Sequence, residues 1–263
     1  MAITFFHKKT LISDLSKVLE NYLTKDEIDL VKKAYKVAKI AHEGQYRQSG
    51  EPYIHHPLAV ALILAELELD YYCIVAAILH DCIEDTIVTK EDISETFGEQ
   101  VAHIVEGVSN LTNLEFTSSS QKQASNFQKL FFAMSKDMRV MVIKLADRLH
   151  NMRTIDSVSP EKRMQKAKET AELHAPIARR LGLHSIRVEL DNICFQTIHP
   201  YRYGVLKRKI KNQYGNQKKM ISTIKTEIEN RLESEGINGD IEGRQKQPTS
   251  VYNKMKMKSL KFS

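Results

Sequence analysis

Apolar residues recur at helical spacing along most of the first 200 residues of this 263-residue chain. Thr24 and Glu27 have the Thr-x-x-Glu spacing of a capping box, and apolar residues follow at helical spacing from Ile28 onward. The same period predicts further helices at about residues 57–69, 71–84, 89–96, 98–111, 121–136, 137–154 and 160–181. Because no convincing strand pattern precedes about residue 186, the chain is predicted to be mainly all-α, a helical bundle.

The periodicity changes in two regions. The polar segment 112–123 breaks it and predicts a mobile loop. After Pro200, residues 203–235 predict one long charged helix, and residues 236–244 predict a first strand with turn residues. We therefore expect one domain over residues 1–200 and a second unit over residues 201–263.

Charged and imidazole side chains end one of the apolar segments. His80 and Asp81 follow a run that closes at Leu79, and Glu84 and Asp85 come next. In a continuous helix, residues four positions apart project to one side, which groups all four of these side chains. Carboxylates held against a core repel one another and lose solvation unless a cation compensates. The segment therefore predicts a divalent metal site.

Two other segments supply further ligands. His56 precedes a proline after a loop that contains glycine and serine, and Asp147 lies in an otherwise apolar segment. With His80 and Asp81 they make a set of two imidazoles and two carboxylates. Such a set suits Mn, Fe, Zn or another borderline divalent ion better than Ca.

A helix over residues 144–154 would place Lys144, Asp147, Asn151 and Thr154 on one face. Each feature has an ordinary structural explanation when taken alone, such as a solvated aspartate or a histidine at a helix start. The occurrence of three such segments in order, each interrupting apolar helices, favours a site.

These segments resemble those of a known family. The order His56, His80-Asp81, Asp147 is that of the HD superfamily of metal-dependent phosphohydrolases. The longer strings Gly44–Ala61, His80–Thr86 and Leu145–Thr154 resemble the bacterial Rel/SpoT family of alarmone enzymes, and the similarity runs from about residue 28 to the end. The hydrolysis-competent, SpoT-like branch is the better match, because every metal and catalytic position is filled. The implied fold is an HD-domain helical bundle followed by a truncated start of an α/β synthetase domain.

The resemblance implies hydrolysis of the 3′-pyrophosphate of (p)ppGpp to GDP or GTP plus pyrophosphate, in stringent-response control. It implies one Mn²⁺ ion, held by His56, His80, Asp81 and Asp147. It assigns Glu84 and Asp85 to catalysis, where they would orient or deprotonate a water and protonate the leaving oxygen.

The resemblance also implies a set of substrate-binding residues: Arg47, Gln48, Ser49, Lys144, Asn151 and Thr154. The planar guanidinium of Arg47 suits stacking on guanine or gripping phosphate. Gln48 departs from the lysine often found at this position in bifunctional members, which bears on the preference between ppGpp and pppGpp. Ser157 stands where an apolar residue near the base is expected.

Charge, apolar runs and cysteine content limit the kinds of partner and compartment that we expect for this chain. The net charge of +6 is uneven, because residues 201–263 hold 15 Lys and Arg against 6 Asp and Glu. A basic half fits nucleic acid or a highly phosphorylated nucleotide, and without a nucleic-acid motif we expect the nucleotide. No apolar run of membrane-spanning length and no signal peptide is present, so we expect neither a membrane nor a secreted protein. Three cysteines without CxxC spacing fit a reducing cytoplasm.

The segment Gly243–Met255 resembles the opening of the family's synthetase domain, whose catalytic carboxylates lie beyond it. We therefore expect hydrolysis without synthesis, and any regulatory or ribosome contacts through C-terminal domains. Two alternatives remain open: an HD phosphohydrolase acting on dNTPs or cyclic nucleotides, and a non-catalytic alarmone sensor. The Arg-x-Ser-Gly-Glu-Pro-Tyr loop argues against the first alternative, and the Glu84–Asp85 pair argues against the second.

Overall fold

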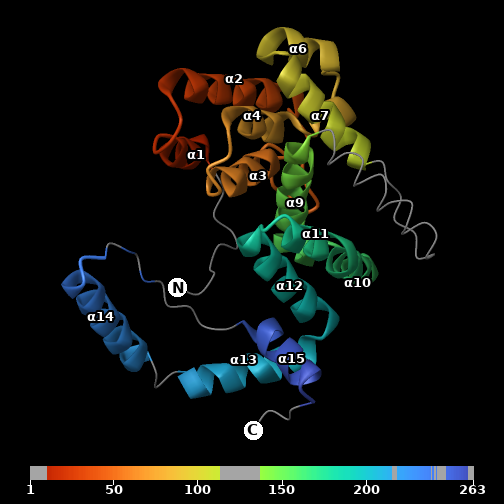
Figure 1. The fold of residues 1–263 in the computed structure, drawn as a ribbon. Helices are drawn as coiled ribbons and strands as arrows, with labels where there is room; N and C mark the ends of the chain where they lie inside the picture. The colour runs from red at the N-terminus through yellow and green to blue at the C-terminus, as the bar shows by residue number, and fades with distance from the viewer. Residues whose placement is uncertain are drawn as a thin grey trace.

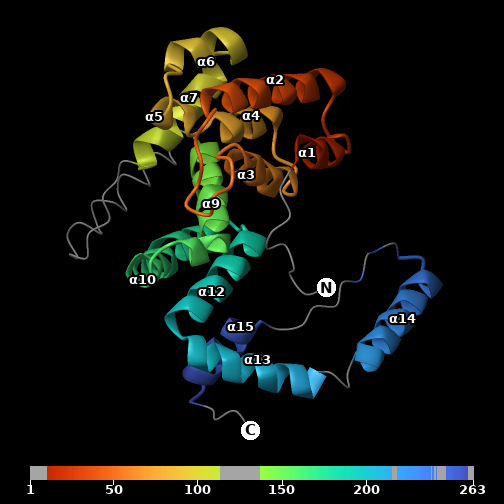
Figure 2. The same ribbon diagram turned by 180° about the vertical axis from the view of Figure 1, so that it is seen from behind.

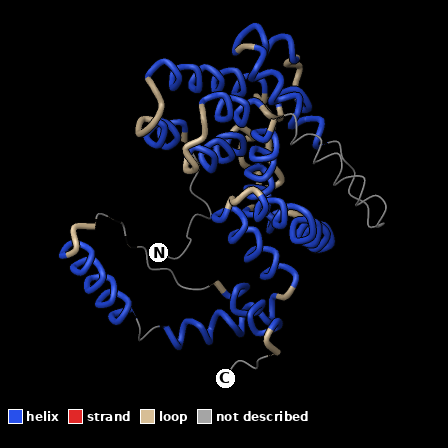
Figure 3. Tube along the Cα trace, viewed as in Figure 1, coloured by secondary structure: helices blue, strands red, loops and turns tan. Residues whose placement is uncertain are grey.

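The computed structural model describes residues 11–112, 137–214, 218–237, 239, 241 and 247–259. Within these ranges the regular structure is helical and contains no named strand, which confirms the all-α prediction (Figures 1 and 3). The helices are α1 (Ile12–Leu19), α2 (Lys25–Ala41), α3 (His55–Ala65), α4 (Tyr71–Leu79), α5 (Cys82–Asp85), α6 (Lys90–Phe97), α7 (Glu99–Thr112), α9 (Met138–Arg153), α10 (Pro160–Glu169), α11 (Ala175–Arg180), α12 (His184–Ile198), α13 (Pro200–Tyr214), α14 (Lys218–Ser234) and α15 (Pro248–Met257). A 3-10 turn, η1 (Ile155–Ser157), follows α9, and a π-helical turn, η2 (Thr170–His174), joins α10 to α11.

Helices α3 and α4 form the centre of the N-terminal bundle. Both are apolar on nearly all sides, and helices of this kind are buried in a core. Leu58 and Leu64 of α3 and Ile74 and Ile78 of α4 are fully buried. Helix α3 packs against α1, α4 and α9, while α4 packs against α2 and α7. The core therefore holds rigidly the two helices whose ends carry predicted ligands.

The predicted capping box is present at the start of α2. The Thr24 backbone N–H donates to Glu27 Oε2 over 2.8 Å, and the Glu27 N–H donates to Thr24 Oγ1 over 3.4 Å. A second cap begins α4, where the Cys73 N–H donates to Asp70 Oδ1 over 2.8 Å. Each cap satisfies backbone donors that a helix start otherwise leaves unpaired.

The predicted continuous helix over residues 71–84 is wrong. Helix α4 ends at Leu79, and α5 begins at Cys82 after a turn at His80 and Asp81. Asp81 has φ −92° and ψ −7°, in the bridge region where many active-site residues lie. The break changes the grouping predicted from helical spacing, because His80 is buried whereas Glu84 and Asp85 are exposed.

Two other predicted boundaries need correction. The helix predicted over residues 57–69 ends at Ala65, and Glu68 takes a left-handed φ of 54° in the turn that follows. The helix predicted over residues 160–181 is present as α10, η2 and α11 in succession, with the π-helical turn in its middle.

Helix α9 connects the two parts of the molecule (Figures 1 and 2). It packs on α3 and α7 in the N-terminal bundle and on α12 beyond it. Helices α10 and α11 in turn lie against α12. Functional groups on α9 are therefore held between the bundle and the α12 layer.

The C-terminal region differs from the single long helix predicted over residues 203–235. Helices α13 and α14 take its place, and residues 215–217 between them lie outside the described ranges. Helices α13 and α15 pack against α12, whereas both views show α14 standing away from the other helices (Figures 1 and 2).

Several predictions fall on undescribed residues. The predicted helix 121–136 and nearly all of the predicted loop 112–123 lie there, as does most of the predicted strand segment. Among the described helices, none combines the length and the apolar character that a membrane span requires.

Candidate metal centre

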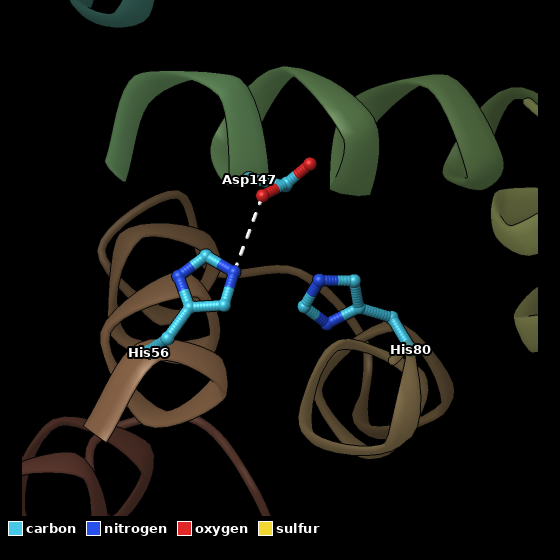
Figure 4. Close-up of side chains that lie close together, drawn as sticks. All are labelled: His56, His80 and Asp147. Carbon is cyan, nitrogen blue, oxygen red and sulfur yellow. Dashed lines mark ion pairs between the residues drawn. The ribbon is translucent and has the colours of Figure 1, made fainter. Parts of the chain in front are cut away.

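Three buried side chains, two from helices and one from the turn after α4, meet at one point. The side chains of His56, His80 and Asp147 offer ligand atoms that all lie within 4.8 Å of one another. His56 comes from the start of α3, His80 from the residue after α4, and Asp147 from α9, and Figure 4 shows all three turned toward a common space. His56 Nε2 lies 3.2 Å from Asp147 Oδ1.

Asp81 adds a second carboxylate to the same point. Its Oδ1 lies 3.1 Å from His80 Nε2, and its Oδ2 lies 3.6 Å from His56 Nε2. The structure therefore brings together the four residues predicted as metal ligands.

The donor set fits a divalent cation. His80 Nδ1 lies 2.8 Å from the carbonyl oxygen of Ala77, which can only accept, so Nδ1 carries the proton and Nε2 presents a lone pair. That Nε2 is buried and has no hydrogen-bond partner in the described part of the chain. A buried acceptor beside two carboxylates is costly without a cation, because its lone pair and their charges are all withdrawn from water. Two imidazoles and two carboxylates suit a borderline divalent ion.

Asp147 is held ionised. Burial opposes ionisation of its carboxyl, but the Lys144 ammonium, 3.0 Å away, outweighs burial and keeps the pKa well below its usual range. The Tyr53 hydroxyl, which donates to Asp81 Oδ2, favours the ionised form of Asp81 against the burial that opposes it. Burial lowers the pKa of His56, so its ring is held neutral, as a metal ligand must be.

Tyr53 connects the cluster to the predicted catalytic pair. Its hydroxyl lies 2.8 Å from Asp81 Oδ2 and 3.1 Å from Asp85 Oδ2, so one phenol reaches both carboxylates. Its ring stacks on His42, with centroids 4.6 Å apart. Burial and the two carboxylates raise the pKa of Tyr53, so the hydroxyl keeps its proton and serves as a donor.

Glu84 and Asp85 occupy the short helix α5 at the rim of the cluster, and both are exposed. The backbone carbonyl of Asp85 accepts a hydrogen bond of 2.8 Å from Gln45 Nε2. Because Gln45 belongs to the loop before α3, this bond holds the rim carboxylates beside the loop. Both side chains face solvent, and Asp85 is linked to Asp81 through the Tyr53 hydroxyl.

A chain of hydrogen bonds runs from Asp147 to the predicted substrate loop. Asn151 Nδ2 donates to Asp147 Oδ1 over 2.6 Å, and Arg47 Nη2 donates to Asn151 Oδ1 over 2.5 Å. Lys144 Nζ lies 3.0 Å from the other oxygen of Asp147. The structure therefore places three predicted substrate-binding residues, Arg47, Lys144 and Asn151, around the cluster.

The remaining predicted substrate residues lie farther out. The loop folds as a tight hairpin in which the Arg47 N–H donates to the Glu51 carbonyl over 2.9 Å, and Gln48 and Ser49 are exposed at its tip. The Thr154 hydroxyl, at the end of α9, lies 3.2 Å from the His150 carbonyl. Ser157 is exposed in η1 and donates to the Thr154 carbonyl over 2.7 Å.

A family model of the HD domain matches residues 34–184, more than half of the chain, and this range contains every group of the cluster. The chain belongs to the HD domain family. HD domain hydrolases depend on divalent metal ions, which agrees with the donor set described above.

This HD domain protein is similar to named bacterial proteins. It is 49% identical over 252 residues to the bifunctional (p)ppGpp synthase/hydrolase SpoT of Escherichia coli K12. It is equally similar, at 49% over 252 residues, to the guanosine-3′,5′-bis(diphosphate) 3′-pyrophosphohydrolase of Vibrio cholerae. These two alignments cover 96% of the chain but 36% of each relative, so the chain spans about a third of their length.

A solved structure shares the fold. It is described as "A metazoan ortholog of SpoT hydrolyzes ppGpp and plays a role in starvation responses", and it aligns with a TM-score of 0.53 and 26% identity. The alignment covers 68% of this HD domain protein and 98% of that chain. Together with the bacterial relatives, it confirms the resemblance to the Rel/SpoT family.

The sequence left three residues of the site without a role: His42, Tyr53 and His150. Tyr53 and His150 each lie three positions from a ligand, Tyr53 before His56 and His150 after Asp147, and this spacing was the available signal. His42 is buried 3.7 Å from Cys82 Sγ, and burial raises the pKa of the Cys82 thiol to about 12. Cys82 is therefore a buried neutral thiol.

Proposed function

We propose that this HD domain protein hydrolyses (p)ppGpp at its 3′-pyrophosphate, giving GDP or GTP plus pyrophosphate. The observation that carries the proposal is one arrangement: a buried cluster of two histidines and two aspartates whose rim bears the exposed Glu84–Asp85 pair. The names of the bacterial relatives support the substrate. The metazoan structure supports hydrolysis by the matched region alone, because the alignment covers nearly all of that chain and its description states that it hydrolyses ppGpp.

The metal is proposed to be Mn²⁺, held by His56, His80, Asp81 and Asp147. When bound, such an ion lowers the pKa of a coordinated water and offsets the charge of a phosphate. The predominance of imidazole and carboxylate ligands supports Mn²⁺ but also accommodates other borderline ions.

Glu84 and Asp85 are proposed to transfer the proton of the attacking water during hydrolysis. An exposed carboxylate beside the cluster accepts a proton from the attacking water and returns it to the leaving 3′ oxygen. The Tyr53 hydroxyl, shared between Asp81 and Asp85, orients Asp85 toward the cluster. The bond from Gln45 to the Asp85 backbone restricts the same carboxylate further.

The substrate is proposed to lie between the loop and α9. Arg47 can stack on the guanine or bind phosphate, and its buried Nη1 has no hydrogen-bond partner within the described ranges. Lys144 would offset phosphate charge, while Ser49, Asn151 and Thr154 would provide neutral contacts to base and ribose. Gln48, exposed at the loop tip, would influence the choice between ppGpp and pppGpp.

Residues 1–200 would form the hydrolase domain, and residues 201–263 a linker helix and the beginning of a synthetase domain. We also propose a cytoplasmic protein, which the three free, buried cysteines support.

The test uses the purified chain, Mn²⁺ and ppGpp labelled in the 3′-diphosphate. Release of labelled pyrophosphate together with GDP is the expected result, and pppGpp should yield GTP. Parallel reactions with dNTPs and cyclic nucleotides address the alternative HD phosphohydrolase. Tight ppGpp binding without turnover, under conditions where Mn²⁺ is bound, would instead identify a sensor.

A further inference from the structure

We propose that His150 is a positioning residue that allows His56 to present an unprotonated Nε2 to the metal. The inference rests on the proposed metal site and assigns a role to a residue outside the predicted ligand set. His150 and His56 lie 94 positions apart, yet their Nδ1 atoms are separated by 2.8 Å. Their rings are tilted by 45° with centroids 4.8 Å apart.

A contact of this length between two ring nitrogens requires one proton between them. If both Nδ1 atoms carried hydrogens they would collide, and if neither did their lone pairs would repel. The pair therefore has two neutral arrangements. In one, His150 donates to His56 Nδ1 and His56 carries its single ring proton on Nε2, facing Asp147 at 3.2 Å. In the other, His56 donates from Nδ1, and its Nε2 lone pair faces the cluster.

Only the second arrangement suits a metal ligand, because a ligating nitrogen must have a free lone pair. His150 makes that arrangement accessible because its Nδ1 accepts a hydrogen bond from the His56 Nδ1–H within the buried region. Without this acceptor, the second arrangement would leave a buried N–H unpaired, which is costly. A hydrogen bond to the far nitrogen of a ligating histidine sets its tautomer and orientation in metal sites generally.

The comparison with His80 strengthens the assignment. His80 Nδ1 contacts the Ala77 carbonyl at 2.8 Å, and a carbonyl can only accept, so His80 is held permanently in the ligating tautomer. His56 has no such fixed acceptor at its Nδ1 and contacts an imidazole that can either donate or accept. The ligating tautomer of His56 therefore depends on the side chain of His150. That of His80 depends only on a backbone carbonyl.

The experiment compares three substitutions in the full chain. His150→Phe removes the acceptor while keeping a ring, and His150→Asn retains a short side chain that can accept or donate. Leu149→Val is the control, because Leu149 is buried on the same helix and its change loosens packing without altering the hydrogen bond. Mn²⁺ affinity is measured by calorimetry, and urea unfolding confirms that each variant folds.

His150→Phe is expected to weaken Mn²⁺ binding by about 10–100-fold, the usual loss when the partner of a ligating histidine is removed. His150→Asn should recover much of the affinity, and Leu149→Val should leave it near that of the unchanged chain. Equal losses for His150→Phe and Leu149→Val, or unchanged affinity in His150→Phe, would overturn the proposal.

Nitrogen-15 NMR of the histidine rings gives a readout that does not depend on turnover. With diamagnetic Zn²⁺ bound, His56 is expected to carry its proton on Nδ1, and without metal one of the two Nδ1 atoms should be protonated. Protons on both Nδ1 atoms, or on neither, would overturn the assignment. Metal binding of the expected kind without ppGpp hydrolysis would refute the proposed function alone, whereas absence of metal binding by the unchanged chain would refute both.

Discussion

At the scale of single residues, the site depends on charges that only other charges or a cation can balance. Lys144 donates to one oxygen of Asp147 and Asn151 donates to the other, while His56 Nε2 lies 3.2 Å from Oδ1. Asp81 has its contacts with two ring nitrogens and the Tyr53 hydroxyl. Removing either carboxylate therefore changes both the charge and the hydrogen bonding of the cluster.

Asp81→Ala is predicted to abolish stoichiometric metal binding and turnover, because it deletes one oxygen ligand from a small set. Metal content after desalting and the rate of pyrophosphate release check this. Asp29→Ala is the control, since Asp29 is exposed on α2 and its carboxylate lies 3.6 Å from Lys32 Nζ. Full metal content with normal hydrolysis in the Asp81 variant would show that this residue is not a ligand.

Glu84→Gln and Asp85→Asn are each predicted to lower kcat by about 10²–10⁴ while metal content and KM stay near those of the unchanged chain. The expected reason is loss of a proton acceptor at the rim of the cluster, where both side chains are exposed. Steady-state kinetics and metal analysis test the prediction, with Glu91→Gln on the exposed surface of α6 as the control. If either change strips the metal, that carboxylate is a ligand.

At the scale of elements, the position of Asp147 depends on how closely α9 approaches its neighbours. Helices α7 and α9 are in contact, and Gly107 of α7 faces Val140 of α9. A Cβ atom at residue 107 would lie 2.7 Å from Val140 Cγ2, which is closer than van der Waals contact allows. The missing side chain lets α9 lie close enough to bring its ligand to those of α3 and α4.

Gly107→Ala is predicted to destabilise the chain. Overpacking usually costs about 1–3 kcal/mol, and the better helix propensity of alanine offsets about 1 kcal/mol of that cost, so the net loss in the free energy of unfolding should be up to about 2 kcal/mol. Urea unfolding measures the change. Gly204→Ala in α13 is the matched control, because nothing lies within 4 Å of its added Cβ, and it should be neutral or stabilising. In a double-mutant cycle, Val140→Ala should relieve part of the Gly107→Ala cost, and strict additivity would contradict the proposed clash.

At the scale of the whole molecule, the C-terminal helices are packed onto the layer that supports α9. The Phe195 ring of α12 stacks on Tyr252 of α15 with centroids 4.7 Å apart. Thr249 Oγ1 lies 3.3 Å from Asn192 Oδ1. The predicted boundary near residue 200 therefore crosses a packed interface, although the cluster itself lies entirely before it.

A chain shortened to residues 1–199 is predicted to remain helical and to bind Mn²⁺ like the full chain, because the ligands lie between His56 and Asp147. Its melting temperature should fall by several degrees, since Phe195 loses the ring of Tyr252. Circular dichroism and calorimetry check both expectations. Tyr252→Ala in the full chain should shift the melting temperature in the same direction, and an unfolded short chain would show that the boundary is misplaced.

The pH dependence of stability follows from buried histidines that the fold keeps neutral. Burial lowers the pKa of His56, that of His174 and that of His150, the last to about 2. In the unfolded chain all three take up a proton below a pH of about 6.5. The unfolded state then binds more protons than the folded state, so stability falls as pH falls below this value.

Urea unfolding of the metal-free chain between pH 7.5 and pH 5 should therefore show a decrease of up to about 1.4 kcal/mol per pH unit for each such histidine. His174→Phe is predicted to reduce this slope by up to one proton's contribution. His103→Phe on the exposed surface of α7 is the matched control. A slope unchanged in the His174 variant would mean that this residue binds a proton in the folded state.

The sequence by itself determined the helical class and the residues at which the helices carry chemistry. Apolar spacing and the Thr24–Glu27 capping box depend on neighbours within one or two turns, so they can be read locally. The ligand types at His56, His80 and Asp147 were also visible, because each polar group interrupts an apolar run.

Tertiary structure alone decided how those groups meet. The helix breaks at His80 and Asp81 in the folded chain. The Tyr53 hydroxyl reaches Asp81, and His56 pairs with His150, so these contacts join segments up to 94 positions apart. Their geometry depends on how α3, α4 and α9 pack, and no local spacing encodes a distance between separate helices. Periodicity therefore predicted which side chains carry the chemistry, whereas close packing of the core determined their distances and their hydrogen-bond partners.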